Sequence, residues 1–475
     1  MSDSKSPVVF GVPTLMAMVV GSMVGAGIFS LPARFAGQTG VAGALISWAI
    51  AGAGMLMLAF VFQSLAVRKP DLDAGVFAYA KAGFGEYLGF YSAFGYWASS
   101  CVGNVTYWIL IMSTVGALWP ALGEGDTLVA FVLSSACVWI FYLLVRRGVK
   151  EATAINRIVT IAKLVPIIVF VLLVLFLLDA KVFADNFQGT GDVGGLAEQV
   201  RGTMLATVFV FLGVEGASVY SRHARRREDV GRATVLGFLS VLAIFASVTI
   251  VSYGVLPMEE IADLRQPSMA GVLEAAVGPW GKAFVSIGLI ISVLGAYLAW
   301  TLMASEVLFM AAKERDMPKV FARLSEADVP RTAVFATSLA VQVLLLITVF
   351  SEDAFTFALD LTSALSLIPF LLAAGYAVRI AMTRDSYEQQ GDGRNKDLVV
   401  ASLATIYTIV LLFAAGPKFL LISFLLYAPS TALFVIARRE QNRRAFVGVE
   451  WVILAVSVIG AVAGLIALVT GAITI

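Results

Sequence analysis

The chain has 475 residues, of which 60% are hydrophobic and 14% are charged, against averages of about 45–50% and about 25% in soluble proteins. With a mean hydropathy of +0.91, it is too apolar to cover its surface with polar groups, which excludes a soluble protein. A net charge of +1 gives no basic field for nucleic acid, and one histidine with two cysteines is too few for a His/Cys metal site or a haem. The composition predicts an all-α polytopic membrane protein without a cofactor.

Apolar runs of about 20 residues, the length that crosses a bilayer as a helix, recur along the whole chain. The polar opening MSDSKSPVVF has no signal-peptide cleavage site, so insertion is expected to begin with the first run. Two runs near residues 397–437 are separated only by the short segment from Ala415 to Lys418, so the sequence predicts twelve or thirteen spans. They lie roughly at 10–36, 40–66, 86–118, 127–145, 154–178, 200–221, 233–256, 282–312, 332–350, 354–381, 397–415, 418–437 and 450–473.

Basic residues in the connecting loops predict the orientation. If the N-terminus is cytoplasmic, most of the 33 lysines and arginines fall in cytoplasmic segments, Lys163 lies inside a span, and few face outward. The positive-inside rule favours this arrangement. With thirteen spans the C-terminus would then lie outside. The outward-facing cations are Arg34, Lys181, Arg201, Arg265, Lys282 and Lys418.

Two of the predicted spans contain unusual interruptions. The first has three glycines within residues 21–27, each costing up to about 1 kcal/mol in a helix. The sixth has Glu215 between two glycines at mid-membrane depth. Close helix packing is the alternative for the glycines, since Gly21 and Gly25 form a GxxxG pair, but it does not explain a glutamate.

Interrupted helices five spans apart are typical of an inverted 5+5 repeat, in which broken helices expose backbone groups at the bilayer midplane. Free N–H groups suit a carboxylate and free carbonyls suit an ammonium, and an α-amino acid carries both. The predicted organisation is a transporter core over residues 1–437, with spans 1–5 and 6–10 as repeats followed by spans 11–12. Residues 438–475 form a basic loop and a thirteenth span.

Several motifs together resemble the amino acid–polyamine–organocation superfamily, and within it the basic amino acid/polyamine antiporters. They are GSMVGAGIFSLP at 21–32, DAGVFAYAKAGFGEYLGF at 73–90, GVEGASV at 213–219 and DMPKVFARLSEADVPRTAV at 316–334. The resemblance covers about residues 8–440. It implies alternating access around a site at the broken spans.

The resemblance also implies roles for residues at both interruptions. The N–H groups of Gly25, Ala26 and Gly27 would hold the substrate carboxylate. The carbonyls of Met23, Phe209 and Leu212 would face its α-ammonium. Some arginine exchangers have tryptophan in place of Phe209, so their gating details do not transfer to this chain.

The same resemblance assigns the distal part of the substrate to spans 3 and 8. Trp300 would stack on the cationic side chain, a cation–π contact of about 2 kcal/mol when desolvated, with plain packing as the alternative. The stretch from Tyr96 to Asn104 would line the distal pocket. Asn104 and the carbonyls of Ser99 and Ser100 would accept donors from the substrate, unless Asn104 instead joins two helices.

Two charged residues inside spans are candidates for coupling. A lysine in the bilayer costs at least about 2.5–3.5 kcal/mol unless paired or hydrated. Lys163 either extends towards the cytoplasm or, as the resemblance implies, occupies the place of a sodium ion. Glu215 either braces the break of span 1 or changes protonation with the substrate, since burial and nearby cations shift a carboxyl pKa in opposite directions. Glu306 and Asp360 are interpreted as structural or gating groups.

The function predicted first is a secondary transporter that exchanges arginine, ornithine or lysine across the plasma membrane. A proton-coupled, sodium-independent importer of lysine or other amino acids is the main alternative. A non-transporting sensor is more remote, because the loops are too short for a separate domain. An enzyme is not expected, since the spans contain no nucleophile–base pair or metal set. The expected partners are cationic amino acids and the lipid bilayer, and a homodimer is left open.

Overall fold

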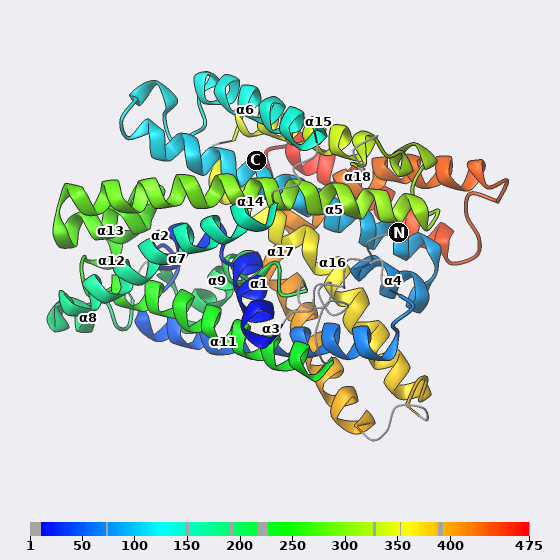
Figure 1. Ribbon diagram of the computed structural model, residues 1–475, viewed down its shortest axis with the longest axis horizontal. Coiled ribbons are helices and arrows are strands. Elements are labelled where there is room, and N and C mark those ends of the chain that lie inside the picture. The colour runs from blue at the N-terminus through cyan, green and yellow to red at the C-terminus, as the bar shows by residue number, and fades with distance from the viewer. Residues whose placement is uncertain are drawn as a thin grey trace, which may run out of the picture.

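The computed structural model describes residues 11–72, 75–147, 152–189, 193–215, 227–325, 329–351, 353–387 and 393–474, and these are almost entirely helical with no strand (Figure 1). The all-α prediction is confirmed. The first part of the chain forms α1 (Val12–Met23), η1 (Gly27–Ser30), α2 (Leu31–Ala36), α3 (Val41–Arg68), α4 (Val76–Phe84), α5 (Glu86–Gly116), η2 (Pro120–Leu122), α6 (Leu128–Arg146), α7 (Ala152–Phe176) and α8 (Ala180–Asp185). The second part forms α9 (Leu196–Phe211), α11 (Arg227–Ser252), α12 (Met258–Ala262), α13 (Ser268–Val277), α14 (Pro279–Lys313), η5 (Lys319–Ala322), α15 (Arg331–Thr348), α16 (Ala354–Thr383), α17 (Arg394–Glu440) and α18 (Glu450–Val469).

Burial separates the helices that form the centre from those that face lipid. The apolar windows of α5 and α16 are 94% and 83% buried, whereas those of α6 and α18 are 22% and 17% buried. In Figure 1, α5 and α16 run through the middle of the bundle, and α6 and α15 lie along its upper edge. Side chains cap two of the spans, because Thr127 accepts from the N–H of Ala130 and Asp353 accepts from the N–H of Thr356. Since α5 and α16 are the buried helices, they are the ones that can enclose a site.

Within the described ranges, nine helices are long and apolar enough to cross a membrane, and the bent pair Leu15–Met23 with Gly27–Ala36 makes a tenth. This number is lower than the twelve or thirteen predicted spans for identifiable reasons. Only Lys163–Phe176 of the fifth span qualifies as an apolar helix and it is too short, the sixth span is described only as far as residue 215, and α17 is counted once. A straight helix of its 47 residues would be about 70 Å long, more than twice the roughly 30 Å hydrocarbon core.

The helix α17 is in fact two helical segments joined at Gly416, whose φ of 72° and ψ of 174° are not helical. This residue falls between the two predicted runs at 397–415 and 418–437. The break would allow α17 to cross the membrane twice, as the thirteen-span prediction requires.

The thirteen-span arrangement leads to a direct test of topology. A tag placed after residue 475 should be accessible to a membrane-impermeant reagent in intact cells, whereas a tag before residue 1 should become accessible only after permeabilisation. Finding both tags protected would mean an even number of spans, with α17 crossing the bilayer once.

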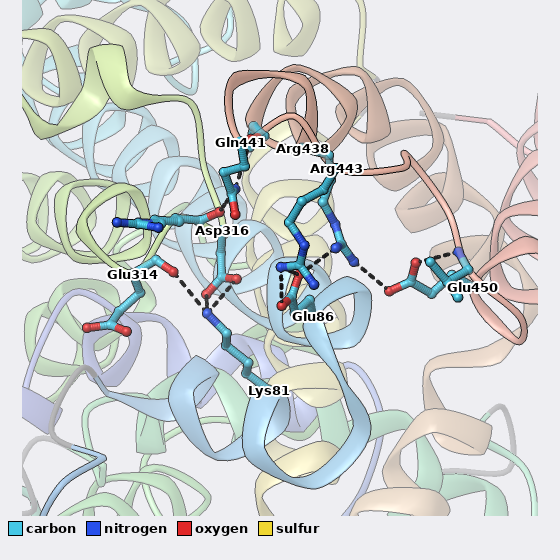
Figure 2. Close-up of polar contacts among 11 residues, drawn as sticks. Lys81, Glu86, Glu314, Asp316, Arg438, Gln441, Arg443 and Glu450 are labelled. Atoms are coloured by element: carbon cyan, nitrogen blue, oxygen red, sulfur yellow. Dashed lines mark hydrogen bonds and ion pairs between the residues drawn. The ribbon is translucent and has the colours of Figure 1, made fainter.

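Ion pairs at one end of the bundle connect the C-terminal helices to the centre (Figure 2). The buried guanidinium of Arg438 contacts Glu86 at 2.8 Å and Glu450 at 3.0 Å, and Arg443 contacts Glu86 at 2.6 Å. Because a buried charge left without its partner is strongly destabilising, Arg438 holds the starts of α5 and α18 against the end of α17. The predicted boundary after residue 437 falls just before this contact.

Beside these pairs, Lys81 of α4 contacts Asp316, in the loop after α14, at 2.9 Å (Figure 2). Burial raises the pKa of Asp316 to about 6, although the Lys81 ammonium acts to lower it. The folded-state pKa thus lies above the unfolded value of about 3.9. The stabilisation from binding this proton is therefore fully present below about pH 4 and is lost as the pH rises through 6.

We therefore expect the free energy of unfolding of the wild type, relative to Asp316→Asn, to fall between about pH 4 and 7, by at most about 3 kcal/mol, and then to level off. Unfolding of the purified protein in detergent measures this difference. Asp385 is the control, because a hydrogen bond from Lys69 lowers its pKa, so its contribution to stability is lost only below about pH 4 and the difference between wild type and Asp385→Asn should stay constant between pH 4 and 7. A difference for Asp316 that rises with pH, or does not change, would contradict the expectation.

Candidate functional site

The first span is broken where the sequence predicts an interruption. Helix α1 ends at Met23, Val24 is extended with a ψ of 92°, and the chain resumes as η1 and α2 at a bend of 46°. Gly21 and Ser22 remain helical, so the break begins slightly later than the glycine-rich segment. Among the described residues, none accepts from the N–H of Gly25 or Ala26, and none donates to the carbonyl of Met23. The break thus presents both unpaired donors and an unpaired acceptor.

The sixth span is also interrupted at the predicted place. Helix α9 ends at Phe211, Leu212 is extended with a ψ of 133°, and Gly213 has a φ of +104°. A Cβ at Gly213 would lie 2.7 Å from the carbonyl oxygen of Ser22, so glycine is required by both its conformation and its neighbour. The rest of the predicted span, from residue 216, lies outside the described residues.

The two breaks contact each other directly. The hydroxyl of Ser22 donates to the carbonyl of Gly213 at 3.1 Å. A Cβ at Gly27 would lie 2.7 Å from side-chain atoms of both Phe209 and Val210. Glycine at this position therefore allows the outer half of span 1 to approach α9.

A small cavity lies between the breaks and the helices α5, α14 and α16. It brings together most of the residues predicted to bind substrate, from segments up to 277 positions apart along the chain. The predicted residues that line it are Met23, Gly25, Ala26, Gly27, Ser99, Ser100, Phe209, Leu212 and Trp300. Gly103, which falls within the predicted stretch from Tyr96 to Asn104, also lines it, and the lining residues that were not predicted are Ser22, Tyr107, Val210 and Thr362.

Tyr107 is the most informative of the missed residues. Its hydroxyl lies 3.2 Å from the position of a Cβ at Gly25, so it lies against the break of span 1. Helical periodicity could have revealed it, because residues 100, 103 and 107 share one face of α5. Thr362 had no comparable signal, since only the packing of α16 against α5 brings it to the cavity.

Three predicted site residues, Tyr96, Asn104 and Glu215, lie outside the described lining of this cavity. The hydroxyl of Tyr96 donates to Oε1 of Glu215 at 2.5 Å, and the N–H of Gly213 donates to Oε2 at 3.1 Å. Glu215 thus braces the break of its own span against α5. Asn104 is fully buried and donates to Thr301 of α14 at 3.2 Å, which is the helix-joining role left open by the sequence.

Lys163 contacts the break of span 1. Its side chain is 3% exposed, and its ammonium donates to the carbonyls of Gly21 and Val24, both at 2.8 Å. These carbonyls lie at the C-terminal end of α1, where the helix dipole favours a cation. The ammonium therefore points to the broken helix and not towards the cytoplasm.

An ion pair connects the outer half of span 1 to span 10. Arg34 of α2 and Asp360 of α16 are 2.6 Å apart, with side chains 12% and 13% exposed. Arg34 also lines a polar cavity of about 990 Å³, together with Glu124, Asp126 and Arg265. The ion pair therefore borders this polar cavity. The other carboxylate, Glu306, is on an exposed face of α14.

Comparisons with known proteins identify the family. The model of the amino acid permease family matches residues 10–458. The chain is 46% identical to an arginine/ornithine antiporter of Pseudomonas aeruginosa, over 97% of both chains. It is 40% identical to an L-lysine transport protein of Corynebacterium glutamicum, over 97% of this chain and 95% of the relative. It is 35% identical to an arginine/ornithine antiporter of Latilactobacillus sakei, over the whole of both chains.

These matches extend through both broken spans and the helices that surround the cavity. Permeases carry amino acids across a membrane and do not convert them, so the chain is a membrane transporter and not an enzyme. The resemblance inferred from the motifs is confirmed. The chain belongs to the amino acid permease family.

Proposed function

We propose that this permease is a secondary transporter of cationic amino acids that exchanges arginine for ornithine by alternating access. Relatives that match along nearly the whole chain are named as arginine/ornithine antiporters and as an L-lysine transport protein. The three amino acids share an α-carboxylate, an α-ammonium and a cationic side chain. A site for them needs a place for a carboxylate, a place for an ammonium and a surface for a second cation.

The unpaired backbone groups at the two breaks are the observation that supports this proposal most strongly. The N–H groups of Gly25 and Ala26 have no acceptor in the described structure, and the carbonyls of Met23 and Leu212 have no donor there. Buried peptide groups are otherwise nearly always hydrogen-bonded. We therefore assign the two N–H groups to the substrate carboxylate and the two carbonyls to its α-ammonium.

The distal wall of the cavity suits a long cationic side chain. Trp300 lines it from α14, and the hydroxyls of Ser99 and Ser100 are already bonded, to Thr362 and to Tyr96. Aromatic and carbonyl groups are therefore what remains for the substrate cation at this wall. This chemistry favours arginine, ornithine and lysine over neutral amino acids.

Alternating access requires parts that open on either side of the cavity. The Arg34–Asp360 pair is suited to close the outer side, because separating it frees α2 from α16. On the other side, Lys163 holds the carbonyl end of α1. We assign it the place of a coupling sodium ion.

We further place the protein in the plasma membrane, with its N-terminus cytoplasmic and its C-terminus outside. The distribution of basic residues supports this orientation. A homodimer stays a prediction.

Exchange is tested with the purified protein in proteoliposomes. Radiolabelled arginine should enter vesicles loaded with ornithine at least about tenfold faster than empty vesicles, without sodium on either side. Gly27→Ala should block this uptake, because its Cβ would collide with Phe209 and Val210, whereas Gly195→Ala, which has open space, should not. Equal uptake into empty vesicles when a proton gradient is imposed would contradict exchange and support the importer.

Trp300 provides a sharper test of the distal wall. If the indole stacks on the substrate cation, Trp300→Leu should weaken arginine binding by more than about fivefold, that is by about 1 kcal/mol, because leucine has no π face. Trp300→Phe and Trp300→Tyr should retain most of the affinity. Arginine binding to the three purified variants measures this effect. Equal affinities in all three would show that Trp300 only packs and does not stack on the substrate.

A further inference from the structure

A third and larger cavity lies away from the substrate site, at the end of the bundle where the predicted cytoplasmic basic residues gather. It has about 1800 Å³ of empty space. Helix α3 forms its floor and packs against both α11 and α17. The cavity is bounded by the end of α3, the start of α11, the end of α16 and the start of α17. We refer to it as the α3 groove.

The walls of the α3 groove are mainly apolar. Phe60 and Val67 of α3, Leu236 of α11 and Val400 of α17 are among the residues that line it. The two flanking helices also carry apolar side chains exposed on the outside of the bundle. On α11, Leu236 and Leu239 are 50% and 44% exposed, and on α17, Val399 and Leu403 are 58% and 49% exposed. The groove is therefore continuous with surfaces suited to lipid chains.

One side of the α3 groove carries an unusual arginine. Arg68 is 10% exposed and contacts Asp397 at 2.7 Å, and its guanidinium lies 3.7 Å above the ring of Tyr387. Asp397 also accepts hydrogen bonds from Ser64 and Tyr387, both at 3.1 Å. The Nη1 of Arg68 is nevertheless buried without a hydrogen-bond partner. A buried guanidinium donor is expensive to leave unsatisfied, but Arg34, Arg265 and Arg438 each have one such nitrogen too, so Arg68 indicates a ligand only together with the other cations of the groove.

Two more cations line the same groove. Arg232 of α11 and Lys396 of α17 are exposed, and neither pairs with an acidic side chain in the part of the chain that the structure describes. Since Asp397 balances Arg68, the described side chains of the groove carry an excess of two positive charges. An anionic group such as a phosphodiester, with its one negative charge, would be attracted to this end of the groove.

The geometry points to the α3 groove as a binding site for an anionic phospholipid of the cytoplasmic leaflet. The headgroup phosphate would be held by Lys396, Arg232 and the free Nη1 of Arg68, and an acyl chain would cover the apolar wall. A soluble phosphate compound would satisfy the cations equally well but would leave that wall in water. The apolar wall and its continuity with the lipid-facing sides of α11 and α17 therefore favour the lipid.

Lipid retention by the full-length protein tests this assignment. The wild type is purified in detergent, incubated with vesicles of phosphatidylglycerol or of phosphatidylcholine, and examined by native mass spectrometry. We expect phosphatidylglycerol to be retained preferentially. The double variant Arg232→Gln/Lys396→Gln should weaken this retention roughly tenfold or more, since each cation contributes about 1 kcal/mol at an anionic surface.

Two further variants test whether lipid retention depends on the cations of the α3 groove in particular. Arg439→Gln/Arg444→Gln removes two exposed cations elsewhere at the same end of the bundle and should retain the lipid as the wild type does. Arg68→Lys keeps the charge opposite Asp397 but removes the planar donor set, so it should lower retention while the protein remains folded.

Three results would overturn the proposal. The first is equal retention of the two lipids by the wild type. The second is an equal loss of retention in both double variants. The third is displacement of phosphatidylglycerol by millimolar inorganic phosphate alone, which would assign the groove to a soluble anion.

Discussion

Replacing Lys163 by alanine is expected to lower exchange at least tenfold while leaving a folded, correctly inserted protein. The Lys163 ammonium donates to the carbonyls of Gly21 and Val24, at the point where α1 ends. Charge-assisted hydrogen bonds of this kind are each worth about 1.5–3 kcal/mol. Without them the end of α1 loses its contact with α7, and the broken span is no longer held in one arrangement. Counterflow of arginine against ornithine at matched protein density measures the effect.

The same experiment decides whether Lys163 replaces a sodium ion. If it does, exchange by the wild type should be unchanged when choline replaces sodium. Lys282→Ala is the matched control, because this lysine is partly exposed at the start of α14 and pairs, among the residues that the structure describes, with Glu274. A steep sodium dependence in the wild type, or equal exchange in Lys163→Ala and the control, would disprove the assignment.

Replacing Glu215 by glutamine should leave the protein inserted but slow its exchange and remove most of its pH dependence. The carboxylate accepts hydrogen bonds from Tyr96 and from the N–H of Gly213, so it is held from two sides. A glutamine carbonyl can still accept from Gly213, and its amide can donate to the Tyr96 hydroxyl. The variant therefore keeps the shape and the contacts of the break and loses only the charge.

Arginine exchange between about pH 5 and 8, at matched expression, distinguishes the two roles of Glu215. A residue that takes part in coupling predicts slow exchange with a flat profile in Glu215→Gln. A residue that only braces the break predicts near-normal exchange with the profile of the wild type. Tyr96→Phe is the companion variant, because it removes one donor and keeps the charge, so its pH dependence should persist.

The sequence alone predicted the membrane class, the spans and both interruptions. These features are local: a long apolar run has few alternatives to a spanning helix, and clustered glycines weaken a helix wherever it packs. The breaks at Val24 and Leu212 therefore lie close to where the glycines predicted them. The junction of α17 at Gly416 likewise falls between two apolar runs that the sequence had already separated.

Other features of the site depend on contacts between residues far apart in the chain. The Ser99 hydroxyl meets Thr362, and Arg34 meets Asp360, across 263 and 326 positions. No periodicity in one span encodes such a pair, because each depends on how two helices pack. The same holds for the separation of Tyr96 and Glu215 from the described cavity lining, and for the position of Tyr107 opposite Gly25.

Lys163 shows how the two levels of information combine. A lysine among apolar residues is recognisable in the sequence as costly and hence as a residue that needs a partner. The sequence did not decide which way this side chain extends, because the charge could be satisfied equally well at the membrane surface or by contact with span 1. Only the packing of α7 beside the end of α1, which brings two unpaired carbonyls within 2.8 Å of the ammonium, decided between them.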